Sequence, residues 1–143
     1  MGLTAQFAGK TIFLDTAPLI YYIEENPRYI KPLSELFIAG NRQECRFISS
    51  VITLIETLVL PMREGRYDIV EKYETILTQS MEMIDINPHI AKMTARLRAA
   101  YSLKIPDAIQ LATGIYHSAD CFLTNDKRLK AIKEITIVFL DDL

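Results

Sequence analysis

The stretch Thr11 to Glu24, TIFLDTAPLIYYIE, decides the fold that we predict for this chain. It begins with the apolar run Ile12-Phe13-Leu14, which is typical of a short strand buried on both faces of a parallel sheet. The run stops at Asp15, and residues 16–18 turn the chain into an apolar helix. Open α/β sheets place their active crevice at the carboxyl ends of the strands. Asp15 is therefore a candidate site residue, although an aspartate here is also an ordinary helix N-cap.

The rest of the chain alternates between strand and helix patterns. We predict further strands over residues 45–48, 81–86, 120–123 and 136–140. Asn26-Pro27 and Asn87-Pro88 each combine a capping residue with proline, which marks a helix start. A last short helix is expected over 126–132. This alternation predicts one α/β domain over residues 1–143, a central parallel sheet with helices on both faces. Residues 1–10 precede the first strand and are a candidate flexible N-terminal arm.

Composition sets limits on the class of protein. Half of the 143 residues are hydrophobic, and the formal net charge is −2, so there is no overall basic signature for nucleic-acid binding. The chain has no signal-peptide pattern and no apolar run near the roughly 20 residues of a membrane span. We therefore expect a cytoplasmic protein without membrane contact. Cys45 and Cys121 lie in apolar runs and are expected to be reduced core thiols.

Glu56 is the most unusual acidic residue. It interrupts VITLIETLVL, residues 51–60, a helix that is apolar on nearly every side. An ionised glutamate buried there would need a cation, a hydrogen-bond donor or a crevice. The alternative is a narrow exposed face of the helix.

Two aspartates stand at other predicted helix starts. Asp107 follows Pro106, and Asp126 lies in LTND, just past a strand. Either could simply complement the positive end of a helix. Thr124 and Asn125 beside Asp126 are turn residues that can donate hydrogen bonds to a neighbouring carboxylate.

These acids can converge, because the carboxyl ends of parallel strands share one edge of the sheet. Four carboxylates drawn together would raise one another's pKa. Hard divalent cations relieve that repulsion, and oxygen-only ligands suit Mg²⁺ or Mn²⁺. Such a site is well suited to attack of a metal-activated water on a phosphodiester.

Four motifs in this order resemble the PIN domain, most closely the VapC-type toxins of toxin–antitoxin pairs. They are LDTAPLI, SSVITLIETL, IPDAIQLATG and FLTNDKRL, and the resemblance runs from about Thr11 to Leu140. It implies a Mg²⁺- or Mn²⁺-dependent endoribonuclease. The acids of the family match Asp15, Glu56, Asp107 and, for the more variable fourth, Asp126; Thr124 matches a hydroxyl that supports the pocket. The chain departs from many relatives at Ala17, where they carry Ser or Asn.

We expect Asp15 and Asp107 to hold the principal metal ion, with Glu56 binding it directly or through a water. Asp126 would complete the site or hold a second ion. Basic residues near the motif ends are candidate phosphate contacts: Arg63, Arg66, Lys104, Lys127, Arg128 and Lys130.

The resemblance also implies partners: an RNA substrate, a cognate antitoxin and a second copy of the chain. The antitoxin is expected in an apolar groove between the first two helices, lined by Leu19, Tyr21, Tyr22, Ile23, Ile30, Leu33 and Phe37. The alternative is that these residues are all core and the protein works without a partner. Two other functions stay open: a housekeeping RNA-processing nuclease, and a PIN-like module that binds RNA or protein without cleaving.

Overall fold

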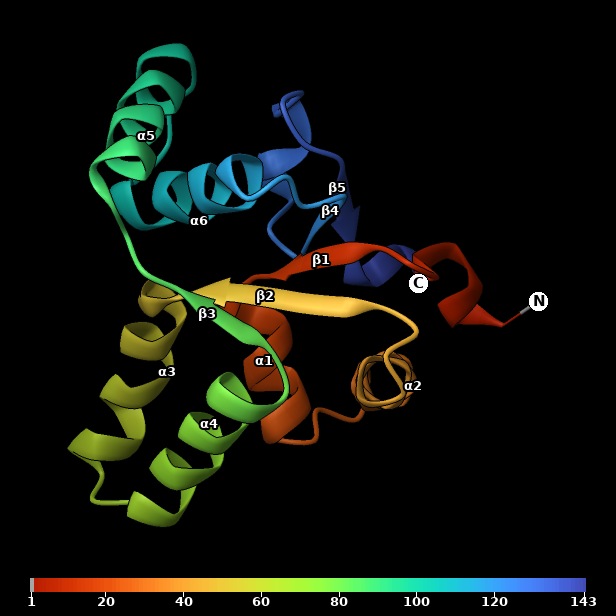
Figure 1. Cartoon of the computed structure of the whole chain (residues 1–143). Coiled ribbons are helices and arrows are strands. Elements are labelled where there is room, and N and C mark those ends of the chain that lie inside the picture. The colour runs from red at the N-terminus through yellow and green to blue at the C-terminus, as the bar shows by residue number, and fades with distance from the viewer. Residues whose placement is uncertain (1) are drawn as a thin grey trace.

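The computed structural model describes residues 2–143 and contains one sheet of five parallel strands (Figure 1). The strand order is β3-β2-β1-β4-β5, and every neighbouring pair is parallel. The strands are β1 (Thr11–Leu14), β2 (Arg46–Ser50), β3 (Glu82–Ile84), β4 (Cys121–Thr124) and β5 (Ile137–Phe139). The predicted α/β fold with a central parallel sheet is confirmed, and β1 is its middle strand.

Helices cover both faces of the sheet. In Figure 1, α5 and α6 lie on one side of the strands, and α1 to α4 lie on the other. Their bounds are α1 (Thr16–Ile23), α2 (Ile30–Asn41), α3 (Val51–Arg63), α4 (Tyr67–Gln79), α5 (Pro88–Ala100) and α6 (Ile105–Tyr116). Short 3-10 helices are η1 (Leu3–Phe7), η2 (Lys127–Ala131) and η3 (Leu140–Asp142). No helix within residues 2–143 has the length and apolar character that crossing a bilayer requires.

The middle strand explains why its sequence is a continuous apolar run. Ile12 and Leu14 belong to the core beneath α1 to α4, whereas Phe13 belongs to the core beneath α5 and α6. All three side chains are 0% exposed. The Phe13 ring stacks on Phe122 of β4, with ring centroids 5.0 Å apart. Burying a side chain of this size contributes about 1.5–3 kcal/mol, so β1 anchors both layers.

Two local predictions need correction, and a third is confirmed. Asn26-Pro27 does not begin α2: the Asn26 carboxamide oxygen accepts from Arg28 N at 3.0 Å within a turn, and the helix starts at Ile30. The predicted short helix after Asp126 is present, as a 3-10 helix over Lys127–Ala131. Within the candidate N-terminal arm, residues 3–7 are folded, because the apolar side chain of Phe7 is buried in the core at 2% exposure.

Candidate active site

The predicted acids lie along the edge of the sheet where the strands end. Asp15 directly follows β1, and Asp126 lies two residues after β4. Glu56 is on α3, which follows β2 without a loop, and Asp107 is in the first turn of α6. Because β2 and β4 flank β1, three of these positions are set by neighbouring strands.

Asp15 is half-buried and held by two donors. Thr16 N donates to Oδ1 at 2.8 Å, which makes Asp15 the N-cap of α1, and Thr124 Oγ1 donates to Oδ2 at 2.8 Å. Burial raises the pKa of Asp15 to about 6, although the bonds from Thr124 and Thr16 oppose the rise. The negative charges of Asp107 and Glu56 also raise this pKa, which indicates that the three carboxylates share one electrostatic environment.

Glu56 is exposed rather than buried, so the interpretation of a buried glutamate is wrong. The helix around it leaves an apolar face open to solvent, and this is why its sequence looked apolar on nearly every side. The Glu56 carboxylate nevertheless contacts the residue that follows Asp15, because Thr16 Oγ1 donates to Glu56 Oε1 at 2.7 Å. A hydroxyl next to Asp15 therefore ties α3 to the start of α1.

Asp107 and Asp126 form the other half of the cluster, with Arg128 beside them. Arg128 donates from Nε and Nη2 to Asp126 at 2.7–3.2 Å, and its Nη2 is 3.9 Å from Asp107 Oδ2. These hydrogen bonds lower the pKa of Asp126. Burial and the charge of Asp126 raise the pKa of Asp107, while Arg128 and Lys104 oppose that rise. A cavity of about 120 Å³ lies between these residues.

The two predicted supporting residues have different positions. Thr124 contacts Asp15, as described above. Asn125 is turned towards the C-terminal segment: its Nδ2 donates to Tyr29 Oη at 2.9 Å, and its Oδ1 accepts from Asp141 N at 3.3 Å. Asn125 therefore secures the chain end beside the site and does not contact the acids.

A divalent metal ion fits the chemistry of this donor set. Within residues 2–143 no three acidic, histidine or cysteine side chains stand close enough to share one ion as they are oriented here. In this arrangement the Asp126 carboxylate is hydrogen-bonded to Arg128, and the Glu56 carboxylate is hydrogen-bonded to Thr16. The candidate metal ligands of Asp15, Glu56 and Asp107 are nevertheless all carboxylate oxygens, the ligand type of Mg²⁺ and Mn²⁺. A cation would also relieve the repulsion that helps to raise the pKa of Asp15 and Asp107.

A set of polar side chains beneath the acids was not among the site residues predicted from the sequence. The set comprises Thr16, Ser49, Ser50, Thr53 and Gln110. All of them except Thr16 are fully buried. A signal was present, because Thr53 and Gln110 are polar residues within apolar helical runs and each lies three positions from an acid. Residues three apart on a helix share a face.

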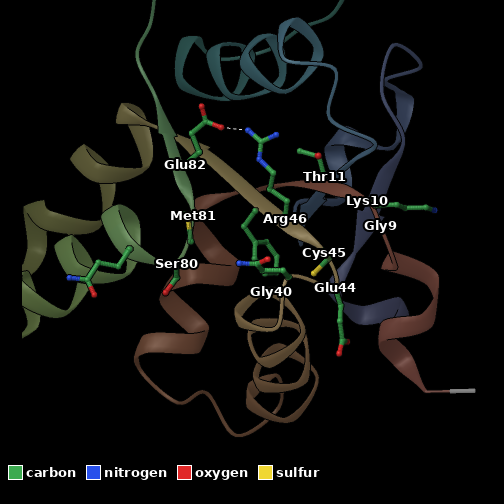
Figure 2. Close-up of a pocket in the computed structure, with 13 residues that line it drawn as sticks. Gly9, Lys10, Thr11, Gly40, Glu44, Cys45, Arg46, Ser80, Met81 and Glu82 are labelled. Carbon is green, nitrogen blue, oxygen red and sulfur yellow. Dashed lines mark hydrogen bonds and ion pairs between the residues drawn. The ribbon is translucent and has the colours of Figure 1, made fainter.

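A larger cavity, of about 490 Å³, lies at the opposite edge of the sheet, where β1, β2 and β3 begin (Figure 2). Arg46 and Glu82 point towards each other across it and form an ion pair. Their charges compensate each other, and the predicted acids are absent from its lining. The site is therefore at the carboxyl edge.

Comparisons with known proteins agree with this geometry. The sequence model of the PIN domain family matches residues 12–135. Similar solved structures include the VapBC2 complex of Rickettsia felis bound to promoter DNA, with 17% identity, 90% of this chain and 98% of that chain covered, and a TM-score of 0.74. A toxin–antitoxin complex from Klebsiella pneumoniae has 27% identity, covers 90% and 97%, and has a TM-score of 0.69. DNA-bound VapBC from Salmonella typhimurium has 20% identity, covers 92% and 98%, and has a TM-score of 0.70. No curated protein sequence matches the chain.

Proposed function

This chain belongs to the PIN domain family, and we propose that it is a metal-dependent endoribonuclease, the toxin of a toxin–antitoxin pair. The observation that carries the proposal is the acid cluster around Asp15, whose pKa of about 6 reflects burial together with the charges of Asp107 and Glu56. The solved structures that resemble it include a complex from Klebsiella pneumoniae that is described as a toxin–antitoxin complex, which supports the pairing.

The acids have separate roles in this proposal. Asp15 and Asp107 hold the principal ion, Mg²⁺ or Mn²⁺, and Glu56 binds it directly or through a water. Asp126 completes the site or holds a second ion. When bound, such an ion supplies an activated water and neutralises charge on the phosphodiester. Thr124 and the Thr16 amide keep the Asp15 oxygens oriented, each through a 2.8 Å hydrogen bond.

Cleavage of a panel of structured RNAs in parallel with Mg²⁺, Mn²⁺ and EDTA tests this activity. We expect cutting with either metal and none in EDTA, and Asp15→Asn should reduce the metal-dependent rate to the EDTA level with the fold retained. Cleavage by Asp15→Asn at the wild-type rate would refute the proposed chemistry. Binding of RNA without cutting by the wild-type protein would identify a non-cleaving module.

The proposed antitoxin site needs revision from the sequence-based one. Leu19, Leu33 and Phe37 are core residues, at most 3% exposed, and cannot line a groove. The structure instead has a groove of about 710 Å³ between α1, α2 and α4. Its apolar lining is Tyr22, Ile23, Ile30 and Ile76, and its charged lining is Glu25, Asp68, Glu71 and Lys72.

An amphipathic antitoxin helix with basic residues fits this groove, because acidic side chains outnumber the single lysine. We expect Ile76→Asp to abolish co-purification with the product of the adjacent reading frame. Growth arrest by the chain alone, relieved by that product and by Asp15→Asn, would support the toxin role. An active nuclease that is harmless alone and has no partner would be a housekeeping enzyme.

A second copy of the chain is the proposed occupant of the exposed face of α3. Ile55, Val59 and Met62 are 45–57% exposed and follow one another at helical spacing, so they form an apolar stripe. Such a stripe is unfavourable in water unless it is covered. Val59→Lys should convert a dimer to a monomer in light scattering; a wild-type protein that is already monomeric would remove this part of the proposal.

A further inference from the structure

Beneath the acids, buried polar side chains connect the three elements that carry Asp15, Glu56 and Asp107. Gln110 of α6 is 1% exposed and uses both ends of its carboxamide. Its Nε2 donates to Thr53 Oγ1 at 2.6 Å, and its Oε1 accepts from Ser50 Oγ. Ser50 Oγ also accepts from Ile52 N at 3.1 Å, as the N-cap of α3.

The chain of bonds continues from Thr53 to β1. The hydroxyls of Thr53 and Ser49 are 2.8 Å apart, and Ser49 Oγ is 3.0 Å from the carbonyl oxygen of Leu14. A hydroxyl has one proton, and a carbonyl can only accept. Ser49 therefore donates to Leu14, and Thr53 donates to Ser49. The bonds run in one direction, from Ser50 through Gln110, Thr53 and Ser49 to the backbone.

On each of the three acid-bearing segments, one residue of this network is close to an acid in sequence. Gln110 is three residues after Asp107, and Thr53 is three residues before Glu56, so each pair shares a helix face. Leu14 directly precedes Asp15. Thr16 Oγ1, which holds Glu56, is 3.5 Å from Thr53 Oγ1.

The full burial of these groups has a physical meaning. No buried side-chain nitrogen or oxygen in residues 2–143 lacks a hydrogen-bond partner. Apolar side chains would fill the same space without the requirement that every donor meet an acceptor. A fully satisfied network, by contrast, allows only one relative position of the segments that it joins.

We propose that Thr53 and Gln110 are positioning residues, which hold the α3 and α6 acids at a fixed separation from Asp15 so that one metal ion can be shared. This inference rests on the proposed function for its catalytic meaning. Its structural content, the coupling of three acid-bearing segments through one buried network, does not depend on the substrate.

The variants that test it are Thr53→Val and Gln110→Met, which remove the hydrogen bonds and keep nearly the same volume. Thr53→Ser keeps the hydroxyl and is the conservative rescue. Thr94→Val is the matched control: Thr94 is a buried helical threonine whose hydroxyl donates only to the Ile90 carbonyl of its own helix, at 2.8 Å.

Mn²⁺ affinity, measured by electron paramagnetic resonance, and the kcat and KM for RNA are the functional measurements. We expect Thr53→Val and Gln110→Met to weaken Mn²⁺ binding and lower kcat by about 10–100-fold, as loss of groups that orient metal ligands does. KM should change little, and Thr53→Ser should recover both values. Thr94→Val should lower the Tm comparably but leave Mn²⁺ affinity and kcat at wild-type values.

Amide hydrogen exchange of the metal-free protein separates this inference from the proposed function. Thr53→Val and Gln110→Met should each speed exchange in the first turns of both α3 and α6, although each substitution is on only one of them. Faster exchange confined to the mutated helix, or equal to that of Thr94→Val, would overturn the inference. A wild-type protein that neither binds Mn²⁺ nor cuts RNA would instead overturn the proposed function. The exchange pattern would still show whether the buried network couples α3 to α6.

Discussion

Replacing Asp15 by asparagine should stabilise the metal-free protein while removing its proposed activity. The pKa of Asp15 is about 6 in the folded protein, against 3.8 for an ordinary aspartate. Between these pH values the unfolded chain loses the proton while the folded protein keeps it. The folded state therefore loses stability as the pH rises through this window, and the loss is complete above it.

The size of the effect follows from the two pKa values. A rise from 3.8 to about 6 corresponds to at most about 3 kcal/mol. The Asp15 side chain is half-buried. The asparagine of the variant can keep both hydrogen bonds only if the Thr124 hydroxyl turns to accept from the new amide group. Solvent screening and this rearrangement reduce the expected gain for Asp15→Asn to about 1–2 kcal/mol at pH 7.5. For a domain of this size that is about 3–6 °C in Tm.

Thermal unfolding in EDTA at pH 7.5 and pH 4.5 measures it, with Glu74→Gln as the control. Glu74 is an exposed glutamate on α4, so the same carboxylate-to-amide change should shift Tm little at either pH. The gain for Asp15→Asn should be largest at pH 7.5 and shrink at pH 4.5, where the folded carboxyl keeps its proton. An Asp15→Asn protein that is less stable than wild type at pH 7.5 would refute the electrostatic reasoning.

Other substitutions probe the acids and the core separately. Arg128→Gln removes the side-chain hydrogen bonds that lower the pKa of Asp126, so this pKa should rise towards its ordinary value in carbon-detected NMR titrations; an unchanged pKa would contradict that cause. Glu56→Gln can still accept from its threonine partner but loses its charge, and Mn²⁺ affinity should fall at least about tenfold; equal affinity would exclude Glu56 as a ligand. Gly40→Ala places a Cβ 2.8 Å from Cε2 of the buried Phe47 ring, and urea unfolding should show a loss of about 1–2 kcal/mol, since overpacking outweighs the gain in helix propensity.

The sheet could be predicted because its signal is local. Ile12-Phe13-Leu14 is apolar at every position, as expected of a strand covered on both faces, and all three side chains are 0% exposed. The position of Asp15 at the carboxyl end of β1 followed from the same run. The start of α2 was harder, because Asn-Pro forms a turn as readily as a helix start, and local sequence does not separate the two.

Exposure and partner choice were less accessible from the sequence. Glu56 looked buried because its neighbours are apolar. An apolar helix face that is exposed to solvent has the same composition as a face that packs in the core. Leu19 and Phe37 were predicted to be exposed in a groove but are buried. The groove lies elsewhere because residues of α4 also line it, which the sequence did not show. The contact between Gln110 and Thr53 joins residues 57 positions apart, and single-sequence patterns have no access to such pairs.

A crystal structure with Mn²⁺, examined by anomalous scattering, tests the shared acid site most directly. We predict an anomalous peak within about 2.0–2.4 Å of carboxylate oxygens of both Asp15 and Asp107, the range for hard cations and oxygen ligands. Glu56 should contact this ion or one of its waters, and Asp15→Asn crystals should lose the peak. An RNA-cleaving protein whose only manganese lies away from Asp15 and Asp107 would show that these two acids do not share the catalytic ion.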